Sequence, residues 1–112
     1  VADYNAGLRI IDVTDPINAV QLGVVDTAAG TARGIAVSSD NKTVYLATAQ
    51  TGLQLVDVSD LASPALLGGY NTPGTAQDVI ISPDGNTAFV ADNAGGLQCI
   101  DVSNTTNPSL SS

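Results

Sequence analysis

The chain has 112 residues, 44% of them apolar, and a formal net charge of −8 at pH 7. With only three Lys and Arg residues it lacks the basic surface that nucleic acid or an anionic membrane requires, and no apolar run reaches the length of a transmembrane helix. All acidic residues are aspartate, and His, Trp and Met are absent while Val, Ile, Thr, Gly and Asn are plentiful. This composition predicts an all-β fold.

The chain opens on Val-Ala-Asp at 1–3, a strand motif that recurs at 90–92. The sequence is therefore interpreted as an internal segment of a longer protein. Next comes an apolar run at 7–15, which aligns with 52–60 and 96–104 at spacings of 45 and 44 residues. A regular spacing of this kind indicates an internal repeat.

A second pair of segments, 32–48 and 76–92, shares the offset of 44 residues. Each period contains four short apolar runs separated by turn residues, and Pro83 with Gly85 is typical of a tight hairpin. Asn41 is expected to serve the same purpose one repeat earlier. Four strands in a repeat of 40 to 45 residues predict one blade of a β-propeller.

The predicted architecture is a propeller segment of about three four-stranded antiparallel blades, incomplete at both ends. Residues 1–27 are expected to supply the last three strands of one blade, 28–72 a complete blade and 73–112 most of a third. By analogy with propellers, 32–38 and 76–82 are the innermost strands, and 20–26 and 66–71 are outer strands.

The motif order resembles a known family. Val-Ala-Asp at 90–92, the run Gly-Leu-Gln-Cys-Ile-Asp-Val-Ser at 96–103 and Asn-Pro at 107–108 are similar to the LVIVD repeat, and Ser-Pro-Asp-Gly at 82–85 resembles the turn of YVTN-type repeats. The resemblance covers nearly the whole chain. It implies a propeller in a cell-envelope or secreted setting, and it implies no shared active site.

Several residues suited to chemistry have structural interpretations. Asp12, Asp57 and Asp101 recur at one repeat position, where hydrogen bonding to backbone N–H groups is expected. The single cysteine, Cys99, replaces Ile10 and Leu55 and is expected to be buried and unmodified. The acidic turns at 3–5 and 92–93 offer oxygen ligands for calcium, but neither matches an EF-hand, and we predict neither a metal nor a cofactor.

The candidate ligand contacts are positions at which the repeats disagree. At the start of the two inner strands, Arg33-Gly34 in one copy stands opposite Gln77-Asp78 in the next, although the flanking residues match. Scaffold positions recur because each blade needs them. Arg33, Gln77 and Asp78 are therefore the predicted ligand-binding residues near the central channel, with drift at a solvated strand end as the alternative.

The sequence predicts a non-catalytic, extracellular or cell-envelope scaffold that binds a protein or glycan at the propeller face. Without His or Glu, neither a Ser-His-Asp nor a Cys-His arrangement can be assembled. The alternatives are a fragment of a propeller enzyme whose active site lies elsewhere, and a surface protein that assembles through open blade edges. Neither nucleic acid nor membrane insertion is expected.

The last expectation concerns the outermost blade faces. We expect apolar side chains of Leu8, Ile10, Leu97 and Ile100 to be left without a neighbouring blade. The isolated chain is then predicted to be unstable as a monomer, and further blades or further copies of the chain are the partners expected on those faces.

Overall fold

The computed structural model describes residues 1–3, 7–15, 17–25 and 31–111, and within these residues the chain is all β. In chain order the strands are β1 (Ala2–Asp3), β2 (Gly7–Asp12), β3 (Val20–Val25), β4 (Ala32–Val37), β5 (Thr43–Thr48), β6 (Gly52–Asp57), β7 (Ala65–Tyr70), β8 (Ala76–Ile81), β9 (Thr87–Asp92), β10 (Gly96–Asp101) and β11 (Ser109–Leu110). No helix in the described part of the chain is long and apolar enough to cross a membrane.

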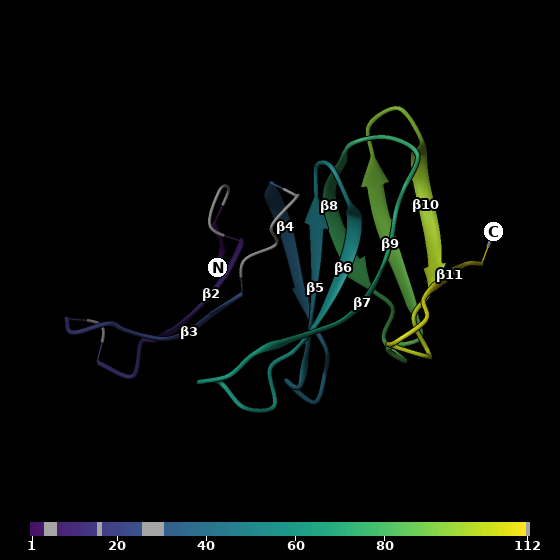
Figure 1. The fold of residues 1–112 in the computed structure, drawn as a ribbon. Coiled ribbons are helices and arrows are strands. Elements are labelled where there is room, and N and C mark those ends of the chain that lie inside the picture. Colours follow the sequence, from purple (N-terminus) through teal and green to yellow (C-terminus); the bar gives the residue numbers. More distant parts are fainter. Residues whose placement is uncertain (4–6, 16, 26–30, 112) are drawn as a thin grey trace.

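The strands form three antiparallel sheets that follow one another in chain order (Figure 1). The first has the order β1-β2-β3, the second β4-β5-β6-β7 and the third β8-β9-β10-β11. We call them blades 1, 2 and 3. Each blade is built from strands that are consecutive in the chain, and the described strands do not close into a barrel. The predicted all-β fold with four-stranded blades is therefore confirmed.

The hairpins that join β4 to β5 and β8 to β9 have the predicted turn residues. Asn41 and Gly85 occupy equivalent positions and both have positive φ, 61° and 76°. Ahead of each, a serine hydroxyl donates to an aspartate at the centre of the turn, Ser38 to Asp40 and Ser82 to Asp84. The backbone N–H of Gly85 also donates to the Ser82 carbonyl at 2.9 Å. The hairpin register is therefore set locally, by residues that adopt the left-handed backbone conformation at little energetic cost.

The recurring aspartates at the ends of β2, β6 and β10 make the predicted backbone hydrogen bonds. Asp12, Asp57 and Asp101 accept from the N–H of the residue two positions on, at 2.9 Å in every case. The N–H groups of Thr14 and Ser59 hold the pKa of Asp12 and Asp57 below the usual 3.8, and the Ser103 hydroxyl does the same for Asp101. Only a short side chain reaches back to its own turn, which explains why aspartate is used without glutamate.

These turns predict acid sensitivity. Asp15, Asp40 and Asp84 also have a lowered pKa, because hydrogen bonds from Asn18, Ser38 and Ser82 favour their charged forms. A depressed folded-state pKa stabilises the fold fully above the unfolded value near 3.8, and this contribution is lost as pH falls through the lower folded value. We expect urea midpoints to hold constant above about pH 5 and to fall between about pH 4 and 2.

The matched control is Asp57→Asn, which keeps an oxygen acceptor for the Ser59 N–H but has no titrating proton. The variant should lose less stability between neutral pH and pH 2 than the unchanged chain. If acid instead raised the midpoint, relief of repulsion within a chain of charge −8 would outweigh the turn hydrogen bonds.

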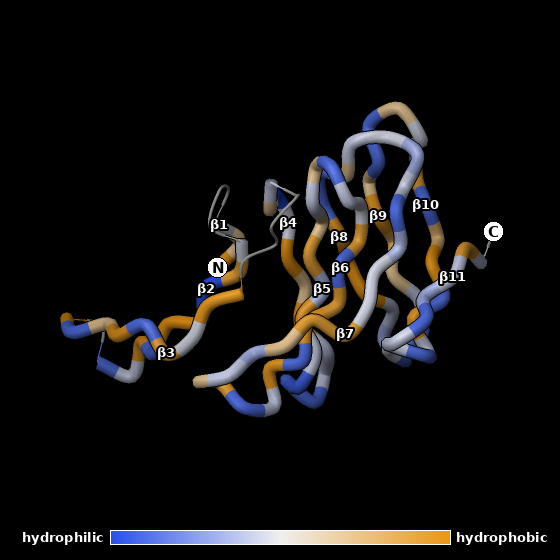
Figure 2. Tube along the Cα trace, viewed as in Figure 1, coloured by the Kyte–Doolittle hydropathy of each residue, from blue (hydrophilic) through white to orange (hydrophobic). Residues whose placement is uncertain are grey.

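Apolar side chains cover both faces of each blade, and alternate residues of one strand point to opposite neighbours. In β5, Val44 and Leu46 pack toward blade 1, whereas Tyr45 and Ala47 pack toward blade 3. We call the face that meets the preceding blade the leading face and the face that meets the following blade the trailing face. Figure 2 shows the apolar stretches of β5, β6, β8 and β9 lying where blades 2 and 3 meet.

The structure corrects two expectations about exposure. Leu8 and Ile100 are buried, because Leu8 lies on the trailing face of blade 1 against blade 2 and Ile100 on the leading face of blade 3 against blade 2. Ile10 packs partly against the same cluster as Leu8. Of the four residues expected to lie open, only Leu97 is exposed, at 67%.

Cys99 was expected to be buried, and this prediction is wrong. Its counterpart Leu55 is fully buried between blades 2 and 3, but Cys99 is only half-buried. The repeat position is the same in both blades, and the difference lies in the neighbour, since Cys99 belongs to the trailing face of blade 3.

Candidate functional site

The predicted ligand-binding residues lie where the inner strands of blades 2 and 3 begin. β4 and β8 are neighbours across the contact between the two blades (Figure 1). In both strands the pairing register shifts at the first residues, between Ala32 and Gly34 and between Ala76 and Asp78, as in a β-bulge. The residues left out of the ladder are Arg33 and Gln77. Such shifts re-aim a side chain away from the regular pleat.

The shift brings these two side chains together. The Arg33 guanidinium donates to the Gln77 amide oxygen at 3.2 Å, although the residues are 44 positions apart. Arg33 is exposed and Gln77 half-buried, so both remain accessible to a ligand. The pair presents N–H donors from two blades at one point of the surface.

Asp78 lies beside the pair on the same strand. Its Oδ1 accepts from the Val79 N–H at 2.9 Å, and its side chain is exposed. The neighbouring strand reaches it only because Gly34 has no side chain, since a Cβ there would lie 2.7 Å from the Asp78 Cα. Arg33, Gln77 and Asp78 therefore form one cluster of hydrogen-bond donors and acceptors.

Asp92, at the end of β9, is expected from the sequence to belong to an acidic hairpin turn, but its side chain is buried and binds another segment of the chain. Its side chain is 2% exposed. Oδ1 accepts from the Thr72 hydroxyl at 3.1 Å, and Oδ2 accepts from the Gly74 N–H at 2.8 Å. Both oxygens thus bind the segment that leads into β8.

The acidic turns form no metal cluster in the described part of the chain, where no three ligand-type side chains come together. Residues 4 and 5 of the first turn lie outside the described residues.

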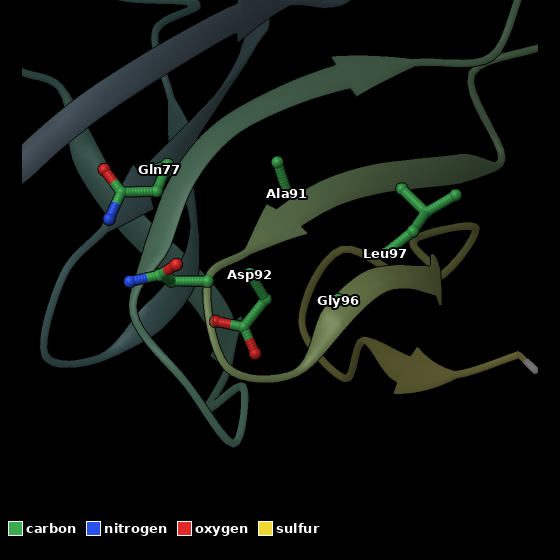
Figure 3. A pocket seen from close by; sticks show the side chains of 6 residues that line it. Gln77, Ala91, Asp92, Gly96 and Leu97 are labelled. Atoms are coloured by element: carbon green, nitrogen blue, oxygen red, sulfur yellow. The ribbon is translucent and has the colours of Figure 1, made fainter.

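A shallow hollow of about 340 Å³ lies next to the cluster, on blade 3 (Figure 3). It is lined by Gln77, Ala91, Asp92, Asn93, Gly96 and Leu97. In blade 2 the counterparts of Ala91 and Leu97 are Ala47 and Leu53, and both are fully buried. The hollow therefore belongs to an open blade face, and the polar cluster at its edge is the better candidate for ligand contact.

The repeat, the blades and the inner-strand cluster define the chain as a β-propeller-like repeat module. The family model of the LVIVD repeat matches residues 1–27, 29–72 and 73–112. The chain belongs to the LVIVD repeat family, as the sequence resemblance indicated. A comparison with curated proteins found no significant match.

Proposed function

We propose that the chain is a non-catalytic propeller scaffold that binds a protein or glycan ligand at the cluster formed by Arg33, Gln77 and Asp78. The mechanism is display. Rigid blades hold polar side chains at one end of the inner strands, and a partner docks on them without covalent chemistry. The proposal involves neither metal nor cofactor.

One observation carries the ligand contact. The two inner strands share a register shift at the same repeat position, yet the side chains there differ, Arg33 in one blade and Gln77 in the next. A repeated backbone feature with a non-repeated side chain is what a scaffold with a variable binding position requires. The 3.2 Å hydrogen bond between the two side chains orients them without burying the guanidinium.

The non-catalytic part of the proposal is supported by composition, because the sequence contains neither His nor Glu and has a single cysteine. The extracytoplasmic setting is supported by the family resemblance alone. Fractionation of the source cells tests it directly, since recovery of the protein with cytoplasmic markers would contradict it.

The ligand contact is tested with a glycan array and a displayed peptide library, each screened against the unchanged chain, Arg33→Ala and Lys42→Ala. Both substitutions remove one positive charge, but Lys42 lies in the hairpin at the other end of β4. We expect Arg33→Ala to weaken selected ligands about tenfold or more, as for residues central to an interface, and Lys42→Ala to leave them unchanged. Equal losses in the two variants would reduce the effect to net charge and contradict the proposal.

A further inference from the structure

Two stretches of the chain have the form Asn-x-Thr, which is an acceptor sequence for N-linked glycans. They are Asn-Lys-Thr at 41–43 and Asn-Thr-Thr at 104–106. A sequence this short also arises by chance, so the surroundings of each asparagine decide between the two. An acceptor asparagine lies in an exposed loop, where the fold does not need its amide nitrogen.

Asn104 begins a turn that all three blades contain. The N–H of the residue two positions on donates to a side-chain oxygen of Asp15 in blade 1, of Asp60 in blade 2 and of Asn104 in blade 3, at 3.1, 3.1 and 3.2 Å. A second bond closes each turn, from the N–H three positions on to the backbone carbonyl of the same residue. The turn therefore requires only an oxygen acceptor, which a carboxylate supplies as well as an amide does.

The amide of Asn104 is thus a departure from the repeat that the fold does not require. Two positions on, Thr106 stands where blades 1 and 2 have Ile17 and Ala62. The Thr106 hydroxyl also donates to Asn104 Oδ1, at 2.8 Å, so the oxygen accepts both bonds and Nδ2 has no part in the turn. Asn104 and Thr106 are both exposed. The two changes that distinguish this turn are the two that an acceptor sequence requires.

Asn41 lies in a different setting. It occupies a left-handed position in the hairpin between β4 and β5, with a φ of 61°, and Thr43 belongs to the β5–β6 ladder. Asn41 also lines a hollow of about 450 Å³ between blades 1 and 2. A glycan on Asn41 would crowd the contact between these blades, whereas one on Asn104 would extend from an exposed turn into solvent.

We propose that Asn104 is the attachment site of an N-linked glycan. The donor class is a glycan carried on a polyprenyl phosphate or pyrophosphate. In the transfer, Asn104 Nδ2 forms a bond to the anomeric carbon of the first sugar while the bond from that carbon to the phosphate oxygen breaks. The polyprenyl phosphate or pyrophosphate is the leaving group, and Nδ2 gives up one proton to solvent.

This inference rests on the extracytoplasmic setting proposed above, because transfer from such donors takes place outside the cytoplasm. It does not depend on the ligand cluster. The turn after β10 lies at the end of blade 3 opposite the start of β8, where Gln77 and Asp78 are found (Figure 1). A glycan on Asn104 therefore leaves the ligand cluster uncovered.

The test is mass spectrometry of the protein isolated from the cells that make it. Trypsin cuts after Arg33 and Lys42, so the two acceptor sequences are separated onto peptides 34–42 and 43–112. We expect the mass of a glycan on the second peptide, located at Asn104 by fragmentation, and an unmodified first peptide. An envelope or secreted protein with unmodified Asn104 would overturn this inference and leave the proposed setting intact. Unmodified protein recovered with cytoplasmic markers would overturn both.

Asn104→Asp is the matched variant, because the aspartates of blades 1 and 2 make the same turn. It should lose the glycan completely while amide exchange across the β9–β10 ladder stays the same. Thr106→Ala should also lose the glycan, whereas Thr106→Ser retains the hydroxyl and with it the modification. Asn41→Gln should leave the glycan in place. A glycan that survives Asn104→Asp, or one found on Asn41 instead, would overturn the assignment.

Discussion

Truncating Leu53 to alanine is expected to lower the free energy of unfolding by about 2–5 kcal/mol, whereas Leu97→Ala should cost about 0.5 kcal/mol or less. The two leucines hold the same repeat position. Leu53 is fully buried between blades 2 and 3, and Leu97 lies open on the trailing face of blade 3. Only the truncation of Leu53 therefore creates a cavity and its cost in stability.

The measurement is equilibrium urea unfolding of the unchanged chain and the two variants. Far-UV circular dichroism follows the transition, because the chain has no tryptophan for fluorescence. A loss of 2 kcal/mol is a large share of the roughly 5–15 kcal/mol by which domains are stable. Similar midpoints for the two variants would mean that blades 2 and 3 do not pack as a unit. The comparison thus tests the blade contact itself, independently of any ligand.

The strands and blades could be predicted because they depend on local signals that recur at a fixed offset. The turn residues Asn41 and Gly85 and the aspartates at strand ends act on their own backbone, so the sequence around them suffices. Which apolar face is covered could not be predicted in this way. Leu8 and Leu97 look alike in the sequence, but burial depends on the neighbouring blade, and only Leu8 has one.

The candidate cluster was found from the sequence only in part. The disagreement between repeats pointed to Arg33, Gln77 and Asp78, but the register shift that re-aims the first two depends on pairing with β5 and β9. No composition or spacing signal reveals such a shift.

The contacts of Asp92 could not be predicted from local sequence patterns either. Its motif recurs at residues 1–3 and reads as a strand ending in a turn. Its hydrogen-bond partners, Thr72 and Gly74, stand 20 and 18 residues earlier in the chain, beyond the reach of any local pattern. The burial of this carboxylate follows from how blade 3 begins and not from its own neighbours in sequence.

Removing the Asp92 carboxylate is the second change expected to have a large effect. Asp92→Ala should lower the free energy of unfolding by about 3 kcal/mol, because it leaves the buried Thr72 hydroxyl and the Gly74 N–H without their acceptor. Asp92→Asn keeps one oxygen acceptor but turns an amide N–H₂ toward the other donor. The stability of this variant should therefore lie between that of the unchanged chain and that of Asp92→Ala. Urea unfolding measures the series.

Amide exchange at Gly74 separates this role from a general loss of stability. The Gly74 N–H donates to Asp92 Oδ2 at 2.8 Å, so in Asp92→Ala its protection should fall further than that of the β8–β9 ladder. The control is Asp84→Ala, which removes an exposed carboxylate from the hairpin at the other end of the same strands and should leave Gly74 protected. Equal exchange at Gly74 in the two variants would show that Asp92 does not hold the segment entering β8. The start of the inner strand would then owe its position to its other contacts, which are the Asn93 N–H bond to the Thr75 carbonyl, the bond between Arg33 and Gln77, and the close approach of Gly34 to Asp78.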